Sequence, residues 1–89
     1  MIERVIIKVF GIVQGVNFRY YTKERADSLR IAGSIKNHPD GSLEIEAEGE
    51  DNDLDEFIGY IRVGPTAAKI ENVELDYQKP QNQKGFSVL

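Results

Sequence analysis

GSIKNHPDGSLEIEAEG, residues 33–49, has the pattern of two paired strands joined by a tight turn. In its HPDG segment, proline stands second and glycine fourth, which is typical of a type I turn. We therefore expect Ile35 and Leu43 to lie on neighbouring strands. After the turn, apolar residues alternate with glutamates, which predicts a strand with one buried and one solvated face. The apolar residues are Leu43, Ile45 and Ala47, and the glutamates are Glu44, Glu46 and Glu48.

The row of glutamates could suggest a metal cluster, because carboxylate oxygens bind hard cations. A row of charged side chains at a spacing of two residues is more simply the exposed face of a strand, since successive side chains point to opposite faces. The chain has no cysteine and a single histidine, His38, so little else is available for a zinc or iron site. We interpret the glutamates as a solvated sheet face and expect no metal site.

EDNDLDEFIGYIRVGP, residues 50–65, is the clearest helix in the sequence. Asp51, Asn52 or Asp53 can cap its start, and acidic residues in its first turn suit the helix dipole. Gly64 and Pro65 are typical of a helix end. The side chains that form a narrow apolar stripe at helical spacing are Leu54, Phe57, Ile58 and Ile61.

A weaker helical pattern follows residue 17. The apolar face at helical spacing consists of Phe18, Thr22, Ala26 and Leu29, with Tyr21 near it. Arg25 also falls on this face, so we expect its stem to pack and its guanidinium group to reach water.

The remaining segments complete a strand and helix order. Residues 5–10, VIIKVF, predict a largely buried strand, residues 69–77, KIENVELDY, an alternating one, and residues 86–89, FSVL, a short last one. Residues 78–85 read as a surface loop. The order β-α-β-β-α-β predicts an α+β fold, a ferredoxin-like sandwich with an antiparallel sheet and two helices on one face. With 89 residues we expect one domain, residues 1–89.

Composition limits the classes of partner. The net charge is −4, which argues against nucleic acid and acidic membranes but not against a small anion held at a local site. No N-terminal apolar run resembles a signal peptide, and no apolar stretch approaches the roughly 20 residues that span a bilayer. We therefore expect a cytoplasmic protein, a monomer, with no membrane or nucleic-acid partner.

VFGIVQGVNFRYYTK, residues 9–23, joins the first strand to the first helix. Gly11 and Gly15 allow backbone angles that other residues resist, so the loop can turn several N–H groups towards an anion. Arg19 falls in the first helical turn, where a cation opposes the helix dipole and a bound anion would compensate for it. A plain turn remains the alternative, and the pattern is not a P-loop because no Gly-Lys-Ser/Thr follows.

Two motifs resemble those of one known family. GIVQGVNFR, residues 11–19, is similar to the signature Gly-x-Val-Gln-Gly-Val-x-Phe-Arg of the acylphosphatase family, and residues 33–49 resemble its second signature. GP at residues 64–65, AKIENVE after it and GFSVL near the end are also similar. The resemblance covers essentially the whole chain and implies a ferredoxin-like enzyme that hydrolyses the carboxyl-phosphate bond of acyl phosphates without metal or organic cofactor.

The resemblance implies site residues one by one. Arg19 matches the phosphate-binding arginine, and Asn37 matches the asparagine that positions the attacking water. The backbone of the loop matches the phosphate-binding loop, which consists of Gln14, Gly15, Val16, Asn17 and Phe18. These residue types suit the chemistry, because a carboxylate is a good leaving group and the enzyme needs chiefly to hold the phosphoryl oxygens and place a water in line.

Three positions depart from the family pattern. Ile12 stands where a basic residue is common, which removes a charge near the loop. Asn17 stands where glycine is common, and asparagine tolerates positive φ better than most residues. Ser34 stands where an aromatic residue is common, so we expect altered packing beside the site.

Alternative functions and roles remain open at this point. RNA-recognition domains share this topology, but they need basic charge and exposed aromatic side chains, and residues 42–49 are acidic without aromatics. A non-catalytic, regulatory domain that binds phosphate would also keep the loop. We expect His38 to be an exposed turn residue and Gln14 to be structural within the loop, with substrate contact as its alternative role.

Overall fold

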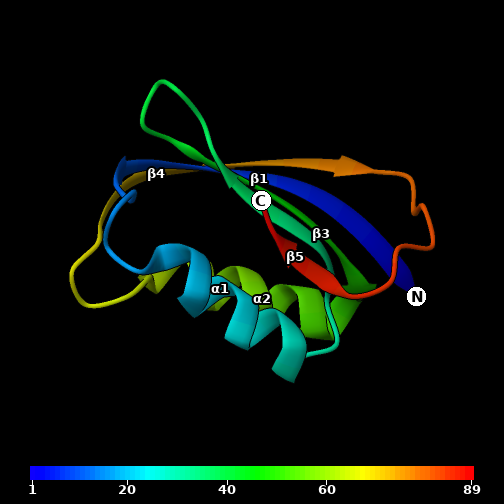
Figure 1. Ribbon diagram of the computed structural model, residues 1–89. Helices are drawn as coiled ribbons and strands as arrows, with labels where there is room; N and C mark the ends of the chain where they lie inside the picture. The colour runs from blue at the N-terminus through cyan, green and yellow to red at the C-terminus, as the bar shows by residue number, and fades with distance from the viewer.

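The predicted hairpin lies inside a five-stranded sheet that two helices cover on one face (Figure 1). The computed structural model describes residues 1–89. Along the chain the elements are β1 (Ile2–Ile12), α1 (Phe18–Ser28), β2 (Ala32–Asn37), β3 (Leu43–Glu50), α2 (Asp51–Val63), β4 (Lys69–Gln78) and β5 (Phe86–Val88). The strand order in the sheet is β4-β1-β3-β2-β5. The ferredoxin-like sandwich with both helices on one face is therefore confirmed.

The sheet departs from the prediction at one edge. β1 pairs antiparallel with β3 and β4, and β2 pairs antiparallel with β3. β5, however, pairs parallel with β2, so the expectation of a wholly antiparallel sheet is wrong at this edge. The reason is that residues 79–85 carry the chain from one edge of the sheet to the other and reverse it, which gives β5 the direction of β2.

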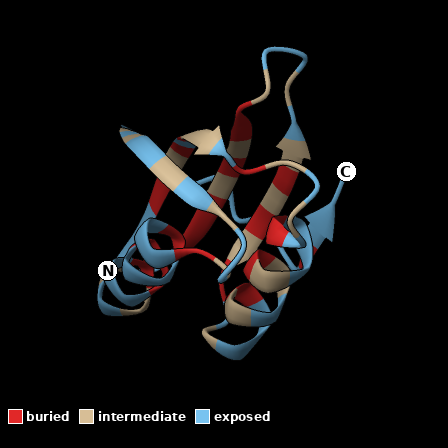
Figure 2. Cartoon of the chain, turned by 90° about the vertical axis from the view of Figure 1, so that its left-hand side faces the viewer, coloured by how far each residue is buried: buried red, intermediate tan, exposed pale blue.

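The core lies between the inner face of the sheet and the two helices (Figure 2). The alternating residues of β1 and β3 are fully buried, and so is the stripe of α2 apart from a slight exposure at Ile58. The alternating residues of β4 are only partly covered, and Tyr77 is 51% exposed. Burying each large apolar side chain contributes about 1.5–3 kcal/mol to folding, which is why the period of two in β3 and the helical period in α2 decide the fold. The buried residues of β1 and β3 are Val5, Ile7, Val9, Leu43, Ile45 and Ala47.

The turn between β2 and β3 forms as expected. The N–H of Gly41 donates to the carbonyl oxygen of His38 at 3.1 Å, and the N–H of His38 donates to that of Ser42 at 2.9 Å. Ile35 pairs with Ile45 in the register of the two strands. These bonds fix Asn37, the last residue of β2, beside the turn.

The start of α2 differs from the prediction. Glu50, and not Asp51, Asn52 or Asp53, is the N-cap residue, and its side chain makes no capping hydrogen bond. Within the first turn, Asp51 Oδ1 accepts from the N–H of Asn52 at 2.8 Å. β3 runs into α2 without a loop, so the last strand residue takes the cap position. The N–H of Asp51 instead donates to the carbonyl oxygen of Met1 at 3.1 Å.

The glutamate row is only partly a solvated face. Glu44 and Glu46 are half-buried, but Glu48 is 4% exposed, so a fully solvated row is wrong at this residue. Its carboxylate accepts hydrogen bonds from the N–H groups of Gln81, at 2.7 Å, and Gln83, at 3.2 Å. The loop before β5 thus passes over β3, and the buried Arg4 guanidinium lies beneath it, bonded to Gln83 and Glu46. No group of three or more His, Asp or Glu side chains here could hold a metal ion.

The apolar face of α1 packs as expected. Phe18, Thr22 and Ala26 are buried in it. The guanidinium carbon of Arg25 lies 4.0 Å from the centre of the Tyr21 ring, so its stem packs and its charged end stays at the surface. Neither helix is long and apolar enough to cross a membrane.

Candidate functional site

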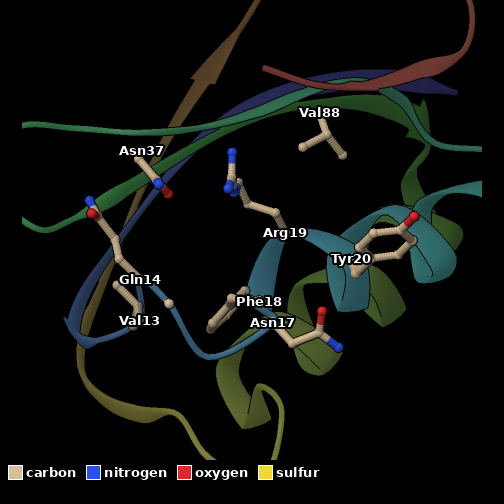
Figure 3. Close-up of a pocket in the computed structure, with 9 residues that line it drawn as sticks. Val13, Gln14, Asn17, Phe18, Arg19, Tyr20, Asn37 and Val88 are labelled. Carbon is tan, nitrogen blue, oxygen red and sulfur yellow. The ribbon is translucent and has the colours of Figure 1, made fainter.

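A cavity of about 200 Å³ opens where α1 begins, beside the end of β2 (Figure 3). Three separate parts of the chain form it: the loop after β1 with the start of α1, the end of β2, and β5. Nine residues line it: Val13, Gln14, Gly15, Asn17, Phe18, Arg19, Tyr20, Asn37 and Val88. The fold therefore brings together residues from the two motifs that are about 20 positions apart in the sequence.

Positive φ angles give the loop after β1 its shape. Before the loop, near the end of β1, Gly11 has φ 130°, and a Cβ atom there would collide with the carbonyl oxygen of Lys69 on β4. Gly15 has φ 73° with open space around it. Asn17, the N-cap residue of α1, has φ 66° in the left-handed region, which asparagine accepts better than most residues. The departure at Asn17 is therefore compatible with the shape of the loop.

The backbone of this loop is rich in free donors. No N–H group of residues 14–18 donates a hydrogen bond to an acceptor in the protein. The first turn of α1 adds to them, since the first N–H groups of a helix have no partner within the helix. Free N–H groups that meet at the start of a helix favour an anion.

Arg19 is the only charged residue that lines the cavity. None of the ion pairs in the structure includes it. Its Nη1 donates to the main-chain oxygen of Leu89 at 3.2 Å, which leaves most of the five N–H donors of the guanidinium without a protein partner. In Figure 3 its side chain reaches towards Asn37 across the cavity. Arg19 is thus not held in a surface ion pair.

Gln14 connects the two halves of the site. Its Nε2 donates to the carbonyl oxygens of His38, at 2.8 Å, and Ser42, at 2.9 Å, the two residues that flank the turn. These bonds hold the loop after β1 against the end of β2. The structural role expected for Gln14 is confirmed, and it acts between two motifs rather than within one loop.

We expect Gln14→Ala to lower the free energy of unfolding by about 1–3 kcal/mol, because two carbonyl groups lose a half-buried donor. Asn37 is then no longer held at a fixed place relative to the loop, and the role that the resemblance implies for Asn37 predicts a lower kcat. Urea unfolding and steady-state kinetics measure the two effects. Gln78→Ala, at an exposed amide on β4, is the matched control and should change neither quantity. An unchanged stability for Gln14→Ala would contradict the role of these bonds.

Hydrogen bonds also stabilise the turn beside Asn37. Asp40 accepts from the Oγ of Ser42 at 2.6 Å and from its N–H at 3.0 Å, and these two bonds lower the pKa of the Asp40 carboxyl.

The second contact of this turn joins His38 to β3. His38 Nε2 lies 3.1 Å from Glu44 Oε1, and the imidazole is half-buried, so the prediction of an exposed turn residue is wrong. Burial alone would raise the pKa of Glu44, but the His38 hydrogen bond and nearby Lys36 and Lys8 together lower it. The hairpin end is therefore held by the Ser42–Asp40 and His38–Glu44 hydrogen bonds and by the ion pair between Lys36 and Glu44.

The cavity includes most of the residues expected in the site, and it adds others. Val16 is absent from its lining, because its side chain packs against the core instead. Ile12 and Ser34, the other departures from the family pattern, do not line it either. The residues that sequence reasoning missed are Val13, Tyr20 and Val88. The predicted strand at residues 86–89 was the only signal for Val88, and its parallel partner was not foreseeable.

The fold and the cavity define a class: a ferredoxin-like domain whose first loop presents free N–H groups and an unpaired arginine. The sequence model of the acylphosphatase family matches residues 5–88. An acylphosphatase of Thermotoga petrophila is 43% identical over 82 residues, 92% of this chain and 91% of that relative. One of Clostridium acetobutylicum is 40% identical over 90 residues, 100% of this chain and 99% of that relative.

A solved structure agrees with these relatives. The crystal structure of acylphosphatase from Bacillus subtilis superimposes with a TM-score of 0.95 at 34% identity, and the match covers 100% of this chain and 99% of that one. The chain belongs to the acylphosphatase family. The family inferred from the two motifs, and with it the enzyme class, a hydrolase, is confirmed.

Proposed function

We propose that this protein hydrolyses the carboxyl-phosphate bond of acyl phosphates to a carboxylate and inorganic phosphate. The observation that carries the proposal is the meeting of the unpaired Arg19, the free N–H groups of residues 14–18 and Asn37 around one cavity. The size is compatible with it, because about 200 Å³ leaves room for a phosphoryl group and part of an acyl group. Arg19, the loop of residues 14–18 and Asn37 meet within a single copy of the chain, so we propose that the monomer is active.

In this proposal the phosphoryl group is held before it reacts. The planar guanidinium of Arg19 donates to two phosphoryl oxygens, and the N–H groups of residues 14–18 donate to the others. Charge that develops on these oxygens during the transfer is then stabilised by donors that are already in place. Because the N–H groups of the loop have no protein acceptor to leave, and Arg19 has only the oxygen of Leu89, binding costs little rearrangement.

Asn37 positions the water. Its amide donates and accepts hydrogen bonds, which fixes the water, but it is a poor proton acceptor. The water oxygen attacks phosphorus in line with the leaving carboxylate, the bond from phosphorus to the carboxylate oxygen breaks, and the water proton passes to a phosphoryl oxygen. No strong acid is needed, because a carboxylate leaves readily as an anion.

Benzoyl phosphate hydrolysis in the presence of a chelator is the experiment that tests this function. In metal-free buffer we expect turnover well above the spontaneous rate, measured as the release of inorganic phosphate. A folded protein that bound phosphate without turnover would instead be a non-catalytic, regulatory phosphate-binding domain. A folded protein that neither hydrolysed benzoyl phosphate nor bound phosphate would contradict both the enzyme and the regulatory phosphate-binding interpretation of the cavity.

A further inference from the structure

Two exposed apolar side chains line the cavity beside Arg19. Tyr20 is 71% exposed and Val88 is 41% exposed, although each is of a type that is normally found at least partly covered. Tyr20 follows Arg19 in α1, and Val88 lies in β5, so the two are far apart in the sequence. We name this pair, Tyr20 and Val88, the apolar rim.

The apolar rim lies away from Asn37. Figure 3 shows Asn37 and Gln14 on one side of the Arg19 side chain, and Val88 and Tyr20 on the other. The sheet register agrees, because Val88 pairs with Ile35, two residues before Asn37 along β2. A phosphoryl group bound at Arg19 would therefore have the amide of Asn37 on one side and the apolar rim on the other.

In-line displacement gives this arrangement a chemical meaning. The attacking water and the leaving oxygen lie on opposite sides of phosphorus. If Asn37 positions the water, the carboxylate and its acyl substituent point to the opposite side, where the apolar rim lies. We propose that the apolar rim binds the acyl substituent, so that this protein prefers acyl phosphates with an aromatic or branched apolar acyl group over acetyl phosphate.

This inference rests on the proposed function and adds the substrate class to it. An aromatic acyl group can stack on the Tyr20 ring and contact the Val88 methyl groups, whereas an acetyl group is too short to cover both. The remaining lining residues do not offer such a surface, because Val13 and Phe18 are 1% and 2% exposed. Selectivity should therefore depend on Tyr20 and Val88, while the phosphoryl contacts are common to every substrate.

The test compares kcat/KM for benzoyl phosphate and acetyl phosphate in the wild type and in Tyr20→Ser/Val88→Thr. We expect the benzoyl-to-acetyl ratio to fall about tenfold in the double variant, through KM rather than kcat, because the lost contacts bind the ground and transition states alike. Tyr20→Phe, which keeps the ring, should keep the ratio. Tyr77→Ser is the matched control, since Tyr77 is a tyrosine 51% exposed on β4 outside the cavity.

An unchanged ratio in the double variant would overturn the role of the apolar rim. Binding of the stable analogues benzoylphosphonate and acetylphosphonate, measured by calorimetry, separates this inference from the proposed function. If the protein hydrolyses neither substrate, the proposed function fails. In that case, tighter binding of benzoylphosphonate than of acetylphosphonate, with a smaller difference in the double variant, would still support the role of the apolar rim. Equal binding of both analogues to the wild type would overturn that role.

Discussion

Arg19→Ala is expected to lower kcat/KM for benzoyl phosphate about 10³-fold or more, the range in which a single arginine acts on a transferring phosphoryl group. The variant should also lose inhibition by inorganic phosphate. Arg19 is the only charged residue of the cavity, so nothing nearby can replace its charge. The fold should survive, because Arg19 is exposed and has no ion pair to lose.

Arg19→Lys separates charge from geometry. Lysine keeps the positive charge but not the planar fork that can donate to two oxygens at once, so we expect it to restore little activity. Arg62→Ala, an exposed arginine at the end of α2 outside the cavity, is the matched control and should behave as the wild type. If Arg19→Lys were nearly as active as the wild type, the bidentate contact would be wrong.

Asn37→Ala should lower kcat roughly 10²-fold and leave KM nearly unchanged, because the lost amide orients the water and not the phosphate. Steady-state kinetics with benzoyl phosphate separate the two constants. Stability should change little, since Asn37 is exposed and its side chain makes no hydrogen bond within the protein. A change in kcat without a change in KM would therefore report on how Asn37 positions the water and not on a loss of folded protein.

Asn72→Ala is the control for this variant. Asn72 is an exposed asparagine on β4, outside the cavity, and its loss should leave both constants unchanged. A higher KM at unchanged kcat for Asn37→Ala would mean that Asn37 binds the substrate and that another group positions the water.

Most of the fold could be predicted because local signals agreed with the packing. Proline and glycine in HPDG fixed the hairpin, and its register then placed every second residue of β3 in the core. α2 has a single apolar stripe, so the side of the helix that packs against the sheet could be predicted from it. These features depend on residues close together in the chain.

The features that were missed depend on segments far apart. The direction of β5 is set by the path of residues 79–85, and three residues of strand carry no signal of their partner. The burial of Glu48 has the same cause, because the N–H groups of Gln81 and Gln83 cover it only where that loop crosses β3. The alternating pattern of β3 cannot predict that a loop from a distant part of the sequence will bury Glu48.

The two motifs predicted residues that line the cavity, but they could not predict the neighbours that the fold brings to it. Arg19 and Asn37 came from the two motifs, and both line the cavity. Val88 could not be foreseen, because it enters the cavity only through the parallel pairing of β5 with β2. Gln14 was expected to be structural, but its partners His38 and Ser42 lie on the other motif and were not predicted.

The parallel edge strand also bears on how the active molecule forms. β5 joins β2 through contacts such as the bond from Leu89 N–H to the oxygen of Ile35, across more than half of the chain. Contacts between distant segments close large loops and form slowly, whereas helices and hairpins form early. The oxygen that accepts the hydrogen bond of Arg19 belongs to Leu89 and arrives only with that edge. A chain with both helices and its central hairpin in place would still lack one wall of its cavity, so completing the fold and completing the site are one event.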